Sequence, residues 1–359
     1  MTDGTSILNT EALGSRPAAS PKQCEKLLPE SLWTLVRSKQ VIAGKYRLDR
    51  LVGRGGMSVV FAAEHTLLRQ RVAMKFLLEQ GDAWPLALAQ LLREARATAR
   101  ITNEHVARVR DVDALTTGQP FIVMEYLEGE DLGHVLQRRG PLGVARSVDY
   151  LMQALEAVGE AHTLGIIHRD LKPENLFLVR RPDGREMIKL LDFGISKVLG
   201  QPGVPPSTRP TNSNSVLGSP YYMSPEQVEK SGSVDQRADI WSLGVVLYEL
   251  LAGEPPFQGR HPLKVLHRIM SEPPPSLRAK QPAVPKELER VIAICLQRNR
   301  ERRFAHAGEL ARALLPFGST SSHRSFDTIW GVIRNARNDV DASSDGAHAD
   351  AREDAQPSG

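Results

Sequence analysis

The segment HRDLKPEN, residues 168–175, places an acid, a lysine, a proline and an amide in one short run. Asp170 precedes Asn175, and a second short run, DFG at residues 192–194, follows. Pro173 removes a backbone hydrogen-bond donor and fixes φ, so a continuous helix through the acid and the amide is disfavoured. We therefore expect a loop in which the side chains of Asp170 and Asn175 turn into one cleft, together with the acid of the DFG run.

These two runs resemble the catalytic loop and the metal loop of the eukaryotic-type protein kinases. The resemblance covers residues 46–315, where the motifs occur in the order that the family has. It implies an α+β fold of two lobes, with a small, mainly β N-lobe over residues 46–127 that carries one helix. A larger, mainly helical C-lobe would cover residues 128–315, and ATP would lie between the lobes.

The resemblance assigns a role to each polar side chain of the two loops. Asp170 would accept the proton of the substrate hydroxyl, and Lys172 would steady the transferred phosphoryl group. Asn175 and Asp192 would hold Mg²⁺, or Mn²⁺ in its place. Lys172 stands two positions after Asp170, which is the serine/threonine pattern, whereas tyrosine kinases typically carry alanine there.

A glycine-rich turn lies between two strand-like runs near residue 55. Glycine lets backbone amides approach a phosphate closely, but many hairpins contain several glycines, so the run alone is a weak signal. The family has a third glycine where this chain has Ser58. The resemblance assigns nucleotide contacts to Val52, Gly53, Arg54, Gly55, Gly56, Met57, Ser58 and Val60. The run GGMS here, and SPEQ at residues 224–227, look most like the bacterial branch of the family.

Lys75 stands in the apolar run at residues 72–76, which is typical of a buried strand. A buried ammonium group is costly unless it is paired, so Lys75 needs an acidic partner. Glu94, on a predicted helix with an apolar face, is the best candidate; taken alone, it would be a surface charge. The resemblance implies that Glu94 holds Lys75 against the nucleotide phosphates.

The apolar run at residues 121–124 predicts another buried strand, followed by a polar turn. The resemblance makes residues 125–127 the hinge between the lobes, although a plain strand and turn would have the same pattern. It assigns further nucleotide contacts to Ala73, Met124, Glu125, Leu127, Asp131 and Phe177. Backbone groups of Glu125 and Leu127 would bond the adenine edge, and Met124 would guard the pocket behind it. Phe177 would form the floor of the adenine site, and Asp131 would bind the ribose.

The segment between residues 194 and 225 is rich in Pro, Ser, Thr and Asn and ends in Ser-Pro-Glu, where the family has Ala-Pro-Glu. The resemblance makes it an activation segment, which a bare linker would not match because of this ending. Phosphorylation is expected at Ser215, with Ser213 next, and Arg169 and Lys197 would bind the phosphate. Simple solvated hydroxyls are the alternative.

Two further contacts of the C-lobe follow from the same resemblance. Asp239 would anchor the backbone of the catalytic loop, and Arg303 would pair with Glu226 of the Ser-Pro-Glu ending. Asn299 and Arg300 depart from the Asp-Pro that the family usually has before this arginine.

Composition narrows the class of protein. The 46 Lys and Arg residues against 42 Asp and Glu give a net charge of only +4, and no nucleic-acid reader motif is present. The two cysteines, Cys24 and Cys295, form no disulfide framework, and the N-terminus has no secretory signal pattern. The most apolar run, residues 240–252, is shorter than the roughly 18 residues of a membrane span. We therefore expect a cytoplasmic protein with no membrane span and no nucleic-acid partner.

The two ends of the chain lie outside the region of the resemblance and give different predictions. Residues 1–45 predict a flexible extension with one short helix, whose apolar face at Leu28, Leu32, Leu35 and Val36 would pack on the small lobe. Residues 316–359 predict a largely disordered polar tail. Within it, Phe326, Ile329, Trp330 and Ile333 have helical spacing and predict one short amphipathic helix docked on the kinase domain.

The chain is therefore expected to be a transferase of signal transduction, a protein serine/threonine kinase that uses ATP and Mg²⁺. Its partners would be protein substrates and, through autophosphorylation, the chain itself. A pseudokinase scaffold is disfavoured because the catalytic and metal residues are intact. A small-molecule kinase of related fold is disfavoured by the Ser-Pro-Glu ending, which serves peptide docking.

Overall fold

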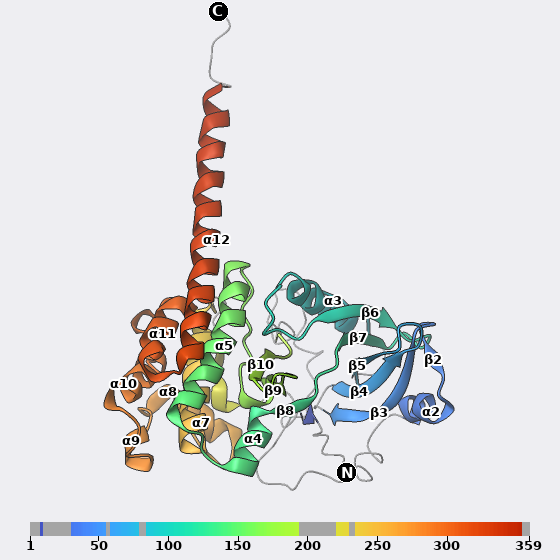
Figure 1. Ribbon diagram of the computed structural model, residues 1–359, viewed down its shortest axis with the longest axis horizontal. Helices are drawn as coiled ribbons and strands as arrows, with labels where there is room; N and C mark the ends of the chain where they lie inside the picture. The colour runs from blue at the N-terminus through green and yellow to red at the C-terminus, as the bar shows by residue number, and fades with distance from the viewer. Residues whose placement is uncertain are drawn as a thin grey trace, which may run out of the picture.

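The computed structural model describes residues 8–9, 30–54, 58–78, 84–193, 220–229 and 234–353. These residues form two lobes, joined through the segment that follows strand β7 (Figure 1). The smaller lobe is built on a largely antiparallel sheet, and the larger lobe is mainly helical. The expected α+β, two-lobed fold is confirmed.

The N-lobe sheet has the strand order β1-β3-β4-β5-β7-β6, and β2 pairs with the outer part of β3. The strands are β1 (Leu8–Asn9), β2 (Val41–Ile42), β3 (Tyr46–Arg54), β4 (Ser58–His65), β5 (Gln70–Leu77), β6 (Val109–Ala114) and β7 (Pro120–Glu125). Because the register aligns Val60 with Lys75, and Ala73 with Met124, these side chains lie on the same face of the sheet.

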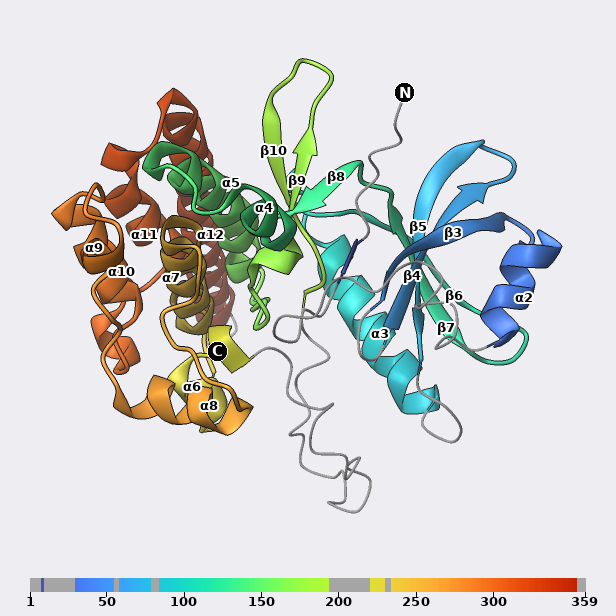
Figure 2. The same ribbon diagram turned by 90° about the horizontal axis from the view of Figure 1, so that it is seen from below.

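The two faces of this sheet pack against different helices. On one face, Phe61 and Met74 share a core cluster with Leu32 of helix α2 (Glu30–Ser38). On the other face, helix α3 (Trp84–Ala99) packs Leu91 against Ile122 of β7. Figure 2 shows α3 between the sheet and the C-lobe and α2 on the far side of the sheet. The predicted N-terminal helix and its docking on the small lobe are thus confirmed, while residues 10–29 lie outside the described part of the chain.

The C-lobe combines a small sheet, in the order β10-β9-β8, with a set of helices. The strands are β8 (Gly129–Asp131), β9 (Leu176–Arg180) and β10 (Glu186–Leu190). The helices are α4 (Leu132–Arg139), α5 (Val144–Thr163), α6 (Pro225–Val228), α7 (Arg237–Ala252), α8 (Pro262–Ser271), α9 (Leu277–Lys280), α10 (Lys286–Cys295), α11 (Ala307–Leu314) and α12 (Thr320–Glu353). Short 3-10 turns are η2 (Pro173–Asn175), η5 (Pro220–Tyr222), η6 (Arg300–Arg302) and η7 (Leu315–Phe317).

Helix α7 lies at the centre of the C-lobe, where a helix that is apolar on nearly all sides can be buried. Its large side chains, such as Trp241 and Tyr248, are almost completely buried. At Gly244, an added Cβ would lie 2.5 Å from the Cβ of Cys295 on α10, so glycine permits the close packing of the two helices. Burial raises the pKa of the Cys295 thiol to about 12, which keeps it protonated and unreactive. None of the described helices combines the length and the apolarity that crossing a membrane requires.

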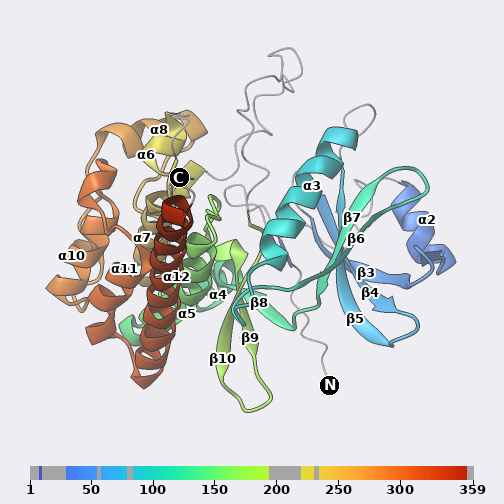
Figure 3. The same cartoon turned by 90° about the horizontal axis from the view of Figure 1, so that it is seen from above.

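The C-terminal tail differs from the expectation of disorder. Residues 320–353 form α12, a single helix that lies beside α5 and then extends beyond the body of the C-lobe (Figures 1 and 3). Ile329 and Ile333 are buried in the C-lobe core and Phe326 packs against it, so the predicted docked helix is confirmed. For residues 320–353, the structure has a helix where a largely disordered tail was expected.

The start of α12 is held by contacts that the polar composition of the tail does not reveal. Asp149 of α5 accepts hydrogen bonds from the Ser319 N–H at 2.8 Å and from the Ser322 hydroxyl at 2.6 Å. Trp330 packs against the His306 ring and beneath the Arg312 guanidinium, 4.5 Å from the ring centroid. A helix that is nucleated by such contacts can extend at low cost, since each further residue adds one hydrogen bond.

Candidate active site

The catalytic loop is fastened to helix α7 by one buried carboxylate. Asp239 accepts hydrogen bonds from the backbone N–H groups of His168 and Arg169, both at 2.9 Å. The His162 ring lies 2.8 Å from the same carboxylate. Burial opposes the ionisation of Asp239, but the hydrogen bonds from His162 and from the loop outweigh it and hold its pKa below the usual value. The expected anchoring of the loop by Asp239 is confirmed.

The DFG run turns its phenylalanine inward and its acid toward the cleft. Phe193 is fully buried and packs on the His168 ring, with 4.7 Å between the centroids. Burial lowers the pKa of His168, so its ring is neutral and the Nε2–H group donates to the Leu191 carbonyl at 3.0 Å. Asp192 has a φ of 44°, which is rare for a residue other than glycine. Strained backbone of this kind is concentrated at functional sites.

Asp170, Lys172 and Asn175 form one hydrogen-bonded unit, and the side chains of Asp170 and Asn175 meet as the sequence predicted. The Asn175 amide donates to the Asp170 carbonyl at 2.8 Å and to its carboxylate at 3.3 Å. The Lys172 ammonium lies 3.3 Å from the same carboxylate. Burial disfavours a charged Lys172, but the carboxylates of Asp170 and Glu174 outweigh it and raise the pKa of Lys172. The lysine is therefore a fixed positive charge beside the candidate base.

The donors that the two loops supply together suit a magnesium ion. Asn175 uses its amide N–H group on Asp170, which leaves its side-chain oxygen as the metal donor. Asp192 adds a carboxylate, and its side chain is 23% exposed. Mg²⁺ is usually held by one or two protein oxygens together with phosphate groups and water, so two donors are enough. Among the residues that the structure describes, no cluster of three or more His, Cys, Asp or Glu side chains could hold a metal.

Lys75 has a partner that the sequence did not indicate. Its ammonium lies 2.8 Å from the Asp192 carboxylate, and the Lys75 side chain is only 12% exposed. Glu94 lies on α3, where a helix was predicted, but its side chain is outside the described part of the structure. The pairing of Lys75 with Glu94 therefore stays a prediction.

The apolar residues that were expected around the adenine fall into two groups. Val52, Val60 and Ala73 are buried in one small cluster with Met124 packed against it. Phe177, which is 2% exposed, packs instead with Ala107 and Leu191, next to Leu127 of the hinge. Gly53 and Arg54 end β3 and Ser58 begins β4, whereas residues 55–57 lie outside the described residues.

Asp131 has a structural role in this structure, and the ribose contact that was expected of it stays a prediction. It is 1% exposed and caps helix α4, because its Oδ1 accepts from the His134 N–H at 3.0 Å. Its Oδ2 lies 2.5 Å from the His134 ring, and this hydrogen bond raises the pKa of His134. Both oxygens are thus engaged by His134, although a carboxylate oxygen can accept more than one hydrogen bond.

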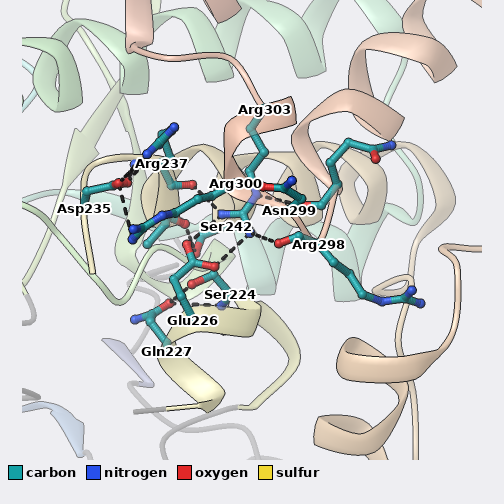
Figure 4. Close-up of polar contacts among 12 residues, drawn as sticks. Ser224, Glu226, Gln227, Asp235, Arg237, Ser242, Arg298, Asn299, Arg300 and Arg303 are labelled. Carbon is teal, nitrogen blue, oxygen red and sulfur yellow. Dashed lines mark hydrogen bonds and ion pairs between the residues drawn. The ribbon is translucent and has the colours of Figure 1, made fainter. Parts of the chain in front are cut away.

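The end of the activation segment is anchored in the C-lobe as expected (Figure 4). The Arg303 guanidinium donates to both carboxylate oxygens of Glu226, at 2.7 and 2.8 Å, and the Arg303 side chain is not exposed. Ser224 and Gln227 form a capping box at the start of α6. Gln227 also donates to the Arg169 carbonyl at 2.9 Å and so links this segment to the catalytic loop.

Gln227 was not among the predicted site residues. The Ser-x-x-Gln pattern, which is typical of a capping box, could have indicated its contact with Ser224. The expected phosphate-binding arginine, Arg169, has no acidic partner among the described residues. Lys197, Ser213 and Ser215 lie outside the described part of the chain, so the regulatory site stays a prediction.

A small cavity lies behind Met124, where the hinge residue was expected to guard a pocket. Its lining comes from both lobes: Ala95, Thr98, Ala107, Val109, Ile122, Met124, Asp192 and Phe193. The DFG run therefore contacts the same space as helix α3 and strand β7.

Comparison with known proteins agrees with this geometry. The family model of the protein kinase domain matches residues 46–314. The serine/threonine-protein kinase Pkn1 of Myxococcus xanthus is 40% identical over 276 residues, which cover 76% of this chain and 38% of Pkn1. The serine/threonine-protein kinase PknB of Mycobacterium tuberculosis is 33% identical over 277 residues, which cover 76% of this chain and 43% of PknB. The chain thus spans less than half the length of these curated relatives.

A solved structure extends the similarity to the fold. The crystal structure of the Mycobacterium tuberculosis PknI kinase domain superposes with a TM-score of 0.60 at 27% identity, covering 78% of this chain and 98% of that domain. The family match spans most of the chain and includes every catalytic residue placed above. The chain belongs to the protein kinase family, and the relatives named here are bacterial serine/threonine kinases.

Proposed function

We propose that this chain transfers the γ-phosphoryl group of ATP to serine and threonine hydroxyls of proteins. The observation that carries the proposal is the unit of Asp170, Lys172 and Asn175, held by Asp239 beside the Lys75–Asp192 pair. Phosphoryl transfer depends mainly on positioning and on charge stabilisation, and this arrangement supplies both.

Each side chain has a defined task in this reaction. The Asp170 carboxylate accepts the proton of the attacking hydroxyl, and the Lys172 ammonium beside it balances the charge of the transferred group. When ATP binds, the Lys75 ammonium, which lies beside the Asp192 carboxylate, also contacts the phosphates. Bound Mg²⁺, or Mn²⁺, would neutralise the phosphate oxygens, and Asn175 and Asp192 would hold it. Asn175 also fixes the direction of the Asp170 carboxylate through its amide.

Two other functions are less well supported. A pseudokinase scaffold would not need a lysine, a base and two metal donors in one connected arrangement. A small-molecule kinase would not need the buried Glu226–Arg303 anchor, which holds the segment that presents a peptide. Since ATP is abundant in the cytoplasm and Cys295 is an unpaired thiol, we place the activity in that compartment.

Radiolabelled ATP with Mg²⁺ tests the proposal directly. The purified chain should label a generic protein such as casein, and itself, on serine and threonine. The Asp170→Asn variant serves as the control for contaminating kinases. Label that appears equally with this variant, or label only on a small molecule, would exclude the proposed function.

We also propose that phosphorylation of the activation segment switches the enzyme on. Arg169, next to the candidate base, is a cation with no acidic partner among the described residues, and a phosphoserine at Ser215 or Ser213 would supply one, with Lys197 as a second cation. Phosphatase treatment should lower the activity, and returning ATP should restore it with phosphate on this segment. Full activity of a Ser213→Ala, Ser215→Ala double variant, with no phosphate between residues 194 and 226, would contradict the switch.

A further inference from the structure

A buried lysine connects the hinge to the C-lobe. Lys189 lies on β10 of the C-lobe and is only 5% exposed, although lysine is rarely buried unless it is paired. Its ammonium lies 3.0 Å from the carboxylate of Glu125, the last residue of β7 and the first residue of the hinge. The ion pair therefore joins one lobe to the other.

Glu125 also forms hydrogen bonds with the backbone of Arg108. Its carboxylate accepts a hydrogen bond from the Arg108 N–H at 3.3 Å, and its own N–H donates to the Arg108 carbonyl at 2.9 Å. The carboxylate oxygen that binds Lys189 is the one that accepts from Arg108. Glu125 is thus fixed through its backbone and its side chain at once.

The segment that includes Arg108 is itself bonded to β10. The Leu190 N–H donates to the His105 carbonyl at 2.7 Å, and the Ala107 N–H donates to the Leu190 carbonyl at 3.0 Å. The His105 ring lies 2.7 Å from the Ile188 carbonyl. The segment of residues 105–108 is therefore bonded to the C-lobe. The Lys189–Glu125 pair adds a direct bond between the C-lobe and the hinge.

We propose that Lys189 is a positioning residue for the nucleotide: through Glu125 it fixes the hinge backbone and the relative position of the lobes before ATP binds. The inference rests on the proposed function, in which the Glu125 backbone meets the adenine edge. A preorganised binding edge improves affinity because less conformational freedom is lost on binding. Loss of the pair should therefore weaken nucleotide binding more than it slows the chemical step.

A purely stabilising role makes a different prediction. Buried ion pairs often add little net stability compared with a pair of apolar side chains, but removing one partner is costly where the other stays buried without a charge to balance it. In Lys189→Met, the Glu125 side chain is left without its cation, but it is 26% exposed and can turn toward water. The variant is thus expected to fold while it releases the hinge.

Calorimetric binding of a nonhydrolysable ATP analogue with Mg²⁺, together with thermal unfolding, separates the two roles. Lys189→Met should raise the Kd about 5- to 10-fold, the scale of one charge-assisted hydrogen bond. In steady-state assays the KM for ATP should rise while kcat changes less than about 2-fold. Lys189→Arg, which keeps the cation, should recover part of the affinity. Lys45→Met is the matched control, since Lys45 pairs with Asp111 within the N-lobe alone, and it should leave the Kd unchanged.

The outcomes distinguish the inference from the function on which it rests. If the wild-type chain binds the analogue and Lys189→Met binds it equally well or more tightly, the inference is wrong, whatever happens to the Tm. If the wild-type chain binds no nucleotide, the proposed function falls, and the inference with it. Should Lys189→Met not fold, Glu125→Gln tests the same pair: a similar rise in Kd supports the inference, and an unchanged Kd overturns it.

Discussion

Replacement of Arg303 by methionine should destabilise the C-lobe by about 3–5 kcal/mol, the cost of leaving one partner of a buried ion pair uncompensated. The Arg303 side chain is not exposed and Glu226 is only 9% exposed, so water cannot replace the guanidinium. Arg303 also donates to the carbonyls of Gln297, at 2.7 Å, and Arg237, at 3.0 Å. These acceptors would lose their donor together with Glu226, which places the expected effect at the upper end of the range.

Urea unfolding followed by tryptophan fluorescence measures this loss, because the Arg303 guanidinium lies 5.1 Å from the centroid of the buried Trp241 ring. Arg237→Met is the matched control. Arg237 also pairs with two acids, but Glu301 is 65% exposed and Asp235 is 36% exposed, so the loss should be about 1 kcal/mol or less.

A double variant tests whether the cost arises from the stranded carboxylate. Glu226→Gln removes the charge that Arg303→Met leaves unpaired, so the double variant should be more stable than the sum of the single losses predicts. A loss of less than about 1 kcal/mol for Arg303→Met, or strictly additive losses in the cycle, would refute the reasoning.

Three further outcomes are expected. Asp170→Asn should lower the single-turnover rate about 10²- to 10⁴-fold with nucleotide binding retained, and near-normal rates would remove it from the role of base. Lys75→Met and Glu94→Gln should show non-additive losses of kcat/KM, whereas independent, multiplying effects would rule out their pairing. Burial raises the pKa of Glu249, whose carboxylate accepts from the Tyr222 hydroxyl, from 4.5 to about 7. Its contribution to stability is therefore complete below pH 4.5 and is lost as the pH rises toward 7. Glu249→Gln should flatten the pH dependence of the unfolding free energy in that window, and an unchanged slope would contradict the assignment.

Local patterns account for the part of the site that could be predicted. Pro173 disfavours a continuous helix at the catalytic loop, and the apolar runs at residues 72–76 and 121–124 predict two buried strands. These inferences depend on residues close in sequence, where backbone geometry restricts the possible structures. The resemblance then supplied pairings that no local pattern contains, such as that of Glu226 with Arg303, and the structure confirmed this one.

Other contacts depended on how distant segments pack. Asp192 pairs with Lys75, Asp131 caps α4, and Asp149 accepts hydrogen bonds from the start of α12. The sequence around a carboxylate does not show which cation or N–H group will bind it in the folded protein. Its partner is chosen by the distance and burial that the completed fold creates.

The sequence alone determined the family, the two lobes and the identity of the catalytic loop, because each is specified by residue types at short, fixed spacings. Only the tertiary structure decided that Lys189 reaches Glu125 and that Asp149 of α5 holds the start of the docked tail helix. Both depend on surfaces assembled from distant segments: the strand β10 that approaches the hinge, and the face of α5 that receives α12. Burial in such surfaces changes the free energy of a charged or an apolar side chain relative to its exposure to water. A local sequence pattern does not show whether that burial occurs.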